Sequence, residues 1–590
     1  MADVPVRSRV KPSAYYDSVT LMLMQREVRA LPGVREAGAV MGTEANKALL
    51  RDAGLETAEA RAAGPNDLVL VVDAESEPVA VAALDHAEAL LARRRLSTGG
   101  SYRPKTIASA VRMLEGANLA LISVPGRFAA GAARDALAAG LHVMLFSDNV
   151  PVEAEVALKR EAAERDLLVM GPDCGTALLG GAALGFANGV RRGPIGIVGA
   201  AGTGIQEVSA LIHRGGAGIS HAVGTGGRDL SEAVGGATAL RALAALAVDP
   251  DTEVIVLISK PPAPAVAARA LGAAQAVGKP VVVAFLGAAV EGRGRVVGAR
   301  TLEEAAELAV RLATGAPPAW PRLQALPAQE GLRLAPGQRY VRGLYSGGTL
   351  CYEALTLLEE HIGPVYSNTP LEPARMLAAT ARSREHTVID MGSDELTVGR
   401  LHPMLDMELR QQRLLREAED PEVAVILLDV VLGWGAHADP AGQLAPVIRQ
   451  ACAQARQAGR WLPVVASVCG TDLDPQVFDA QVAALIDAGA LVQASNAQAV
   501  RLAALIAEAA GARGTRRPPG GPAISPVPTA LPKAGGIVRL LAERPRVVNV
   551  GLELFADSLR AQGVPVISVD WSPPAGGKQS LIEMLDRLGA

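Results

Sequence analysis

The sequence predicts a multidomain α/β protein built on parallel, doubly wound sheets. From about residue 106 onward, short apolar runs of strand length alternate with amphipathic helical stretches, as expected where crossover helices connect parallel strands. Part of this alternation occurs twice in the same order, which indicates an internal repeat. The chain has 590 residues, too many for one core at roughly 150 residues per domain.

Composition narrows the class of partner. The chain carries 57 basic and 61 acidic residues, a net charge of −4, and no long run of either sign, so neither nucleic acid nor an anionic membrane is an expected partner. Its four cysteines include no C-x-x-C pair, and its histidines form no H-x-x-x-H or H-E-x-x-H spacing, so no metal site is expected. With no signal peptide and no apolar stretch of roughly 20 residues, we expect a cytoplasmic protein that acts on a small molecule.

The elements group into five segments separated by stretches rich in Pro, Gly, Ser or Arg. They are a small α+β N-terminal domain at 1–95, a Rossmann-type domain at 106–190, a first flavodoxin-like domain at 191–315, a second at 339–513, and a strand–helix–strand segment at 535–590.

Hydrophobic periodicity predicts the elements of the first two segments in order. In the N-terminal domain, strands are expected at 37–41 and 68–72, with helices at 18–30, from 45, and at 79–94. In the Rossmann-type domain, strands are expected at 119–124, 142–146 and 167–170, with helices at 131–140 and 152–165.

Polar turns follow the strands of the Rossmann-type domain. In parallel sheets the ligand lies beyond the carboxyl ends of the strands, where this chain places 125–127, 147–149 and 171–176. Such residues are also ordinary turn formers. Their occurrence after three successive strands favours a ligand cleft, with Ser147, Asn149 and Cys174 as candidate binding residues.

Two glycine-rich strand–turn–helix segments are the most informative feature of the chain. We call residues 197–207 the first cradle and residues 344–353 the second cradle. Glycine permits close approach to a backbone, and the first turn of a helix presents unpaired N–H groups that attract phosphate or carboxylate. The candidate anion-binding residues are Gly202, Thr203, Gly204, Gly347, Gly348 and Thr349. For the first cradle, a capping box from Thr203 to Gln206 is the alternative that needs no ligand.

Each cradle is followed by matching later elements. A Gly-acid turn at 226–230 corresponds to one at 392–396, and the strand segments at 254–259 and 280–287 correspond to those at 423–431 and 463–470. The second copy is longer, and its excess is expected between Asp390 and Arg413.

Three charged residues are candidate catalytic groups. Lys260 follows a buried strand, where it could bind an anionic substrate or be a solvated loop lysine. Asp429 interrupts an apolar strand, so it needs either a function or a structural partner. Glu207 occupies the same place in its helix as Glu353 in the second cradle, which is compatible with a ligand contact or with a partner for a helix dipole.

The whole chain resembles the FdrA family. The resemblance is carried by YDSV (16–19), MGTEANKALL (41–50), FSDNV (146–150), MGPDCGT (170–176), residues 223–230, SKPP (259–262) and LDVVLG (428–433). More distantly, residues 106 to about 310 resemble the α subunit of succinyl-CoA synthetase, with a CoA-binding-type Rossmann domain before a flavodoxin-like ligase domain. The second cradle half is similar to the ligase domain of that enzyme's β subunit.

This resemblance implies two reactions. FdrA proteins are labelled acyl-CoA synthetases through this kinship, and they are associated with oxamate carbamoyltransferase, acting with two co-encoded partner subunits in allantoin degradation. Synthetases of this superfamily relay phosphate through a histidine in a loop that corresponds to 287–295 here, which contains no histidine. The sequence therefore favours direct transfer between oxalurate plus phosphate and oxamate plus carbamoyl phosphate.

In that hypothesis the cradles hold phosphate or carboxylate, Lys260 neutralises charge, and Asp429 or Glu207 orients the carbamoyl nitrogen. No cofactor is required, although the kinship leaves CoA as a candidate ligand. A CoA-dependent synthetase and a non-catalytic scaffold subunit are the alternatives.

Overall fold

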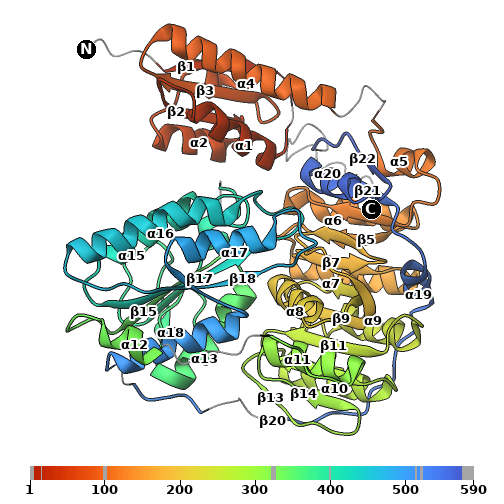
Figure 1. Ribbon diagram of the computed structural model, residues 1–590. Coiled ribbons are helices and arrows are strands. Elements are labelled where there is room, and N and C mark those ends of the chain that lie inside the picture. The colour runs from red at the N-terminus through yellow and green to blue at the C-terminus, as the bar shows by residue number, and fades with distance from the viewer. Residues whose placement is uncertain are drawn as a thin grey trace.

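The computed structural model describes residues 6–573, apart from 13, 15, 98–102, 321–326, 398–399, 512–513 and 519–522. The predicted segment at 535–590 therefore extends beyond the described residues after 573. Figure 1 shows the small N-terminal unit at one end of the molecule and the two halves of the repeat side by side. Among the residues described, no helix has the length and apolar character needed to cross a bilayer.

The N-terminal unit is a three-stranded antiparallel sheet covered by helices. Its central strand is the apolar β3, which lies between β1 and β2. Asp17 and Thr43 cap the first two helices by accepting backbone N–H groups. The elements are β1 (Arg7–Lys11), α1 (Ser18–Arg29), β2 (Val34–Met41), α2 (Glu44–Asp52), α3 (Ala58–Ala62), β3 (Leu68–Ala74) and α4 (Glu77–Ser97).

The Rossmann-type sheet is completed by the C-terminal end of the chain. Its strand order is β22-β21-β4-β5-β6, all parallel, with Val547 in β21 opposite Leu119 in β4. Figure 1 accordingly shows β21, β22 and α20 beside α6, although the two segments are far apart in the sequence, whereas α19 lies beside α9. The elements are α5 (Ile107–Met113), β4 (Leu119–Ile122), α6 (Gly126–Ala138), β5 (His142–Leu145), α7 (Val152–Glu164), β6 (Val169–Met170), α19 (Gly535–Ala542), β21 (Val547–Val550), α20 (Glu553–Ala561) and β22 (Val566–Ser568).

Helix α6 begins earlier than its periodicity predicts. The helix starts at Gly126, so the polar turn at 125–127 forms its first turn. A Cβ on Gly126 would lie 2.2 Å from the carbonyl oxygen of Asp148, which explains the glycine at this close approach.

The first half of the repeat is a seven-stranded sheet with the order β14-β12-β11-β9-β10-β7-β8. The antiparallel hairpin of β7 and β8, within the range predicted for the Rossmann-type domain, forms its edge. The elements are β7 (Thr176–Leu179), β8 (Ala182–Gly185), β9 (Arg192–Ala200), α8 (Gly202–Arg214), β10 (Ile219–Gly224), α9 (Ala237–Val248), β11 (Val254–Ser259), α10 (Pro264–Ala276), β12 (Val281–Phe285), β13 (Ala289–Val290), β14 (Val296–Gly298) and α11 (Leu302–Thr314); β20 (Ala523–Ile524) pairs with β13.

The second half is a five-stranded parallel sheet with the order β16-β15-β17-β18-β19. The elements are α12 (Pro327–Leu332), β15 (Tyr340–Tyr345), α13 (Gly348–Ile362), the 3₁₀ helix η1 (Pro373–Arg375), β16 (Thr387–Asp390), α14 (Asp394–Thr397), α15 (Glu408–Glu419), β17 (Val423–Val431), α16 (Pro440–Gln457), β18 (Val464–Cys469), α17 (Phe478–Asp487), β19 (Ala490–Gln493) and α18 (Asn496–Ala509).

The two halves share one strand order. Numbering the parallel strands of each half along the chain gives 2-1-3-4-5 in both sheets, the flavodoxin-like order. The predicted α/β class with doubly wound parallel sheets is therefore confirmed. The order also makes α13 the counterpart of α8, and α18 the counterpart of α11.

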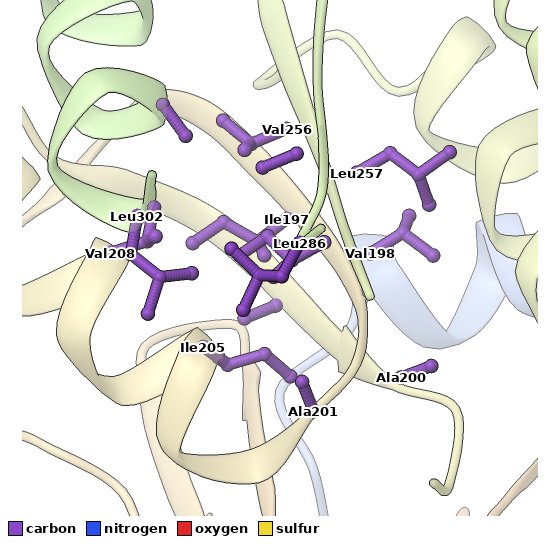
Figure 2. Close-up of a cluster of buried hydrophobic side chains, with 14 of the residues drawn as sticks. Ile197, Val198, Ala200, Ala201, Ile205, Val208, Val256, Leu257, Leu286 and Leu302 are labelled. Atoms are coloured by element: carbon purple, nitrogen blue, oxygen red, sulfur yellow. The ribbon is translucent and has the colours of Figure 1, made fainter. Parts of the chain in front are cut away.

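Apolar side chains set the position of the first cradle. Figure 2 shows Ile205 and Val208 on α8 within the same cluster as Ile197 on β9 and Val256 on β11. A Cβ on Gly199 would lie 2.5 Å from the Ile205 side chain. Glycine at this position therefore lets the helix pack directly on its own strand.

Candidate functional site

The N-termini of α8 and α13 are both uncapped. Their N-cap residues are Ala201 and Gly347, and no described side chain accepts a first-turn N–H of either helix, although Asp429 accepts the N–H of Gly347 itself. Thr203 lies inside α8 rather than at its N-cap, so the structure has no capping box from Thr203 to Gln206. Both helix starts consequently keep first-turn N–H groups that can bind an anion.

The two helix starts meet in a reciprocal contact. A Cβ on Gly347 would lie 2.7 Å from Cγ2 of Thr203, and a Cβ on Gly204 would lie 3.0 Å from Cγ2 of Thr349. Thr203 is 7 % exposed and Thr349 is 3 % exposed. These glycines therefore allow the two helices to touch, and the two predicted cradles form one junction between the halves of the repeat.

Glu207 and Glu353 fasten this junction in the same reciprocal manner. Glu207 Oε1 accepts the backbone N–H of Asn496, the first residue of α18, at 2.9 Å. Glu353 Oε1 accepts the N–H of Leu302, the first residue of α11, at 2.7 Å. Each glutamate thus satisfies a helix start in the opposite half.

Burial raises the pKa of both glutamates, and that of Glu353 reaches about 7. Asn496 also bonds to both Glu353 and Tyr345 through its side chain. Glu207, predicted as a catalytic residue, lies in this interface with 1 % of its surface exposed.

Asp429 holds the backbone of the second cradle in place through hydrogen bonds. Its Oδ1 accepts the N–H of Ser346 at 2.8 Å, and its Oδ2 accepts the N–H of Gly347 at 3.0 Å and the Ser346 hydroxyl at 3.0 Å. Arg410 supplies the counter-charge at 3.0 Å, and Asp429 is fully buried. These contacts account for a carboxylate inside an apolar strand without any substrate.

Lys260 and Asp390 flank the start of α13. A Cβ on Gly348 would lie 3.6 Å from Lys260 Nζ and 2.7 Å from Asp390 Oδ2. Lys260 is exposed at the end of β11, and forms no ion pair with any residue that the structure describes. The ammonium of the first half is therefore available to an anion at the helix start of the second half.

The predicted residues of the Rossmann-type domain divide into structural and accessible groups. Ser147 Oγ donates to the carbonyl of Val124 at 2.6 Å, and Cys174 Sγ donates to the carbonyl of Thr176 at 3.6 Å. Burial raises the pKa of the Cys174 thiol to about 12. Asn149, with φ of 52°, stays exposed, so it is the one of the three with a free surface.

Asp173, which the sequence analysis did not select, links this domain to Lys260. Its carboxyl keeps a solvent-accessible surface, yet the surrounding protein desolvates it and raises its pKa to about 6, against the opposing effect of Lys260. Desolvation disfavours the charged form of a carboxyl group, which is why this pKa rises. The sequence offered one indication of this role, because Asp173 directly precedes Cys174, which was predicted as a binding residue.

His402 was also missed, although it lies between Asp390 and Arg413, where the excess length of the second copy is expected. A Cβ on Gly392 would lie 2.8 Å from His402 Nε2, and the ring packs on Phe186 with centroids 5.7 Å apart. Its Nδ1 accepts the N–H of Met404 at 3.2 Å. Burial lowers the pKa of His402 to about 4, so the neutral ring carries its proton on Nε2.

No cluster of three or more His, Cys, Asp or Glu side chains suited to a metal ion occurs among the residues for which positions are described.

Family models match three parts of the chain. The description "AllF, heavy metal-associated domain" covers residues 4–106, "CoA binding domain" covers 190–287, and "CoA-ligase" covers 344–506. The CoA-binding match thus falls on the segment predicted as the first flavodoxin-like domain.

Relatives extend the comparison to most of the chain. The uncharacterized protein YahF of Escherichia coli (strain K12) is 47% identical over 498 residues, which cover 83% of this chain and 96% of YahF. The α subunit of the ADP-forming succinate–CoA ligase of Aquifex aeolicus (strain VF5) is 33% identical over 161 residues, or 26% of this chain and 51% of that subunit.

Among solved structures, the apo form of the dinucleotide-forming acetyl-coenzyme A synthetase 1 of Ca. Korarchaeum cryptofilum aligns at 20% identity with a TM-score of 0.29. It covers 69% of this chain and 86% of that chain. The near full-length match to YahF and the AllF model show that the chain belongs to the FdrA family and is distant kin of the succinyl-CoA synthetases.

Proposed function

We propose that this chain is a subunit of an oxamate carbamoyltransferase that interconverts oxalurate plus phosphate and oxamate plus carbamoyl phosphate. The observation that carries the proposal is the junction of two helix starts without side-chain caps beside the ammonium of Lys260, which has no ion-pair partner among the described residues. Such a site holds a phosphate through backbone N–H groups and a point charge, as direct displacement requires.

In this reaction the candidate cradle residues contribute their backbone N–H groups. Phosphate oxygens or the substrate carboxylate are bound by the N–H groups of Gly202, Thr203, Gly204, Gly348 and Thr349. Lys260 neutralises the charge that develops on the leaving group. Asp429 acts by holding Ser346 and Gly347 in place. Its role, like that of Glu207, is to position the junction.

The histidines support transfer without a covalent relay. The loop at 287–295 contains none, and the histidine at the second cradle, His402, has its Nδ1 occupied by the Met404 N–H. With the proton on Nε2, the neutral ring has no free lone pair on its accessible nitrogen to accept a phosphoryl group. His402 is suited instead to donate a hydrogen bond.

An acyl-CoA synthetase is the second candidate function, and the matches to the CoA-ligase and CoA-binding models favour it. In the preferred proposal the chain works in the cytoplasm with two co-encoded carbamoyltransferase subunits in allantoin degradation, and CoA is dispensable. A scaffold role remains the third reading of the same fold.

Reconstitution with the two partner subunits tests these functions. With oxalurate and phosphate, carbamoyl phosphate should form without CoA or nucleotide, and Lys260→Ala or Thr203→Pro should reduce kcat/KM roughly 10² to 10³-fold. Lys105→Ala, an exposed lysine away from the junction, is the matched control and should retain the wild-type rate.

The alternatives give different results in the same assay. A strict requirement for CoA and a nucleotide would establish the synthetase reaction, whereas full activity of the partner subunits without this chain would establish a scaffold.

A further inference from the structure

Asp390 presents an unused carboxylate oxygen to the second cradle. It is the last residue of β16, and its side chain is only 8 % exposed. Oδ1 accepts the N–H of Gly392 at 3.0 Å, whereas Oδ2 has no hydrogen-bond partner among the residues described. Oδ2 is not among the described polar atoms that are both shut off from solvent and unpaired, so it keeps a surface at which a ligand can bind.

That oxygen lies next to the first turn of α13. Oδ2 lies 2.7 Å from the position of a Cβ on Gly348, and Lys260 Nζ lies 3.6 Å from the same position. A phosphate or carbamoyl phosphate held by the first turn of α13 would therefore lie beside both groups.

The backbone of Asp390 is held rigidly. Asn368 Oδ1 accepts the N–H of Asp390 at 2.9 Å, and Asn368 Nδ2 donates to its carbonyl at 2.9 Å. The carboxyl group is thus preorganised at the site, as a group that acts on a bound substrate must be.

Its protonation suits proton exchange near neutral pH. Burial raises the pKa of Asp390 to about 6, which Lys260 and the Gly392 N–H oppose and the nearby charges of Asp429 and Asp394 reinforce. A group whose pKa lies near the working pH both gives and takes a proton readily.

We propose that Asp390 is the catalytic acid–base group that carries the proton between phosphate and the amide nitrogen during carbamoyl transfer. This inference rests on the proposed function and gives Asp390 a proton-transfer role, distinct from the orientation of the carbamoyl nitrogen that was expected of Asp429 or Glu207. Both of those carboxylates are already engaged by backbone N–H groups.

The step balances without a further reactant. A phosphate oxygen attacks the carbamoyl carbon of oxalurate, forming the C–O bond, and the C–N bond to the oxamate nitrogen breaks. The Asp390 carboxyl gives its proton to that nitrogen, and its carboxylate then takes the proton of the hydrogen phosphate. Carbamoyl phosphate and oxamate leave, and the carboxyl group is regenerated.

The test compares Asp390→Asn with the wild type in the complete complex. Asparagine retains an oxygen for the Gly392 N–H, so folding and calorimetric phosphate binding should be preserved, whereas kcat should fall roughly 10² to 10⁴-fold. Asp390→Glu should recover part of the loss. The control is Asp487→Asn, an exposed carboxylate at the end of α17, which should keep the wild-type kcat.

A second readout does not depend on turnover. The infrared difference spectrum between wild type and Asp390→Asn should contain a protonated carboxyl band that titrates with a midpoint near 6. A loss of kcat below about tenfold in Asp390→Asn, or the absence of this titrating band, would overturn the inference while leaving the carbamoyltransferase reaction in place. A wild-type complex that forms no carbamoyl phosphate would overturn the function and the inference together.

Discussion

Replacement of Asp429 by asparagine should destabilise the second half of the repeat rather than remove a reacting group. The carboxylate receives three hydrogen bonds from Ser346 and Gly347 and one from Arg410, at distances of 2.8–3.0 Å. In Asp429→Asn the amide turns a donor toward one of these N–H groups and leaves the buried Arg410 without a counter-charge.

The expected cost follows from these contacts. Removing one partner of a buried ion pair costs about 3–5 kcal/mol, so we expect a loss of about this size in the stability of residues 339–513. Asp251→Asn is the matched control, because Asp251 pairs with Arg192 at 2.8 Å with 62% of its side chain exposed, where such pairs contribute about 0–1 kcal/mol.

Hydrogen exchange followed by mass spectrometry measures the effect locally, which matters because a multidomain chain does not unfold in two states. Peptides spanning 340–353 should lose protection in Asp429→Asn and keep it in Asp251→Asn. Unchanged protection of the Ser346 and Gly347 amides would refute the positioning role that the hydrogen bonds assign to Asp429.

Two further predictions concern the junction. Burial raises the pKa of Glu353 to about 7 from 4.5, so between these pH values the folded state binds more protons than the unfolded state. The stability of the folded state should therefore fall as pH rises from about 5 to about 7, by at most about 3 kcal/mol. This fall should be absent from denaturation curves of Glu353→Gln, and the same pH slope in both proteins would contradict the assignment. Gly347→Ala should lower the stability of the protein by about 1–3 kcal/mol, because the added Cβ crowds Thr203. The control is Gly131→Ala in α6, where no atom lies within 4 Å of the added Cβ, and this change should raise the stability by about 0.5–1 kcal/mol. Equal thermal shifts for the two variants would show that the helix starts are not in tight contact.

Sequence periodicity was sufficient for the repeat because each half is built from local strand–turn–helix units. The cradles, the strands that follow them and the Gly-acid turns were found from spacing alone, and the common 2-1-3-4-5 strand order agrees with their equivalence. The sequence did not reveal that β21 and β22 join the Rossmann-type sheet, since pairing with β4 depends on contacts across more than half of the chain.

The residues of the candidate site also fall into those that the sequence predicts and those that only the tertiary structure reveals. Lys260 and the six cradle residues could be selected because strand ends and helix starts are local features, and their chemistry follows from residue type. The partners of Glu207 and Asp429, by contrast, are set by long-range packing. Periodicity contains no information on which helix start a buried carboxylate will meet.

The sequence by itself determined the α/β class, the duplication and the presence of two anion-binding helix starts, because each is encoded within a few consecutive turns. Only the tertiary structure decided that these starts meet in a single junction, that Glu207 and Asp429 position it, and that Asp390 and Lys260 flank its opening. Those outcomes depend on how two separately folded sheets pack, which places side chains from distant parts of the chain within hydrogen-bonding distance.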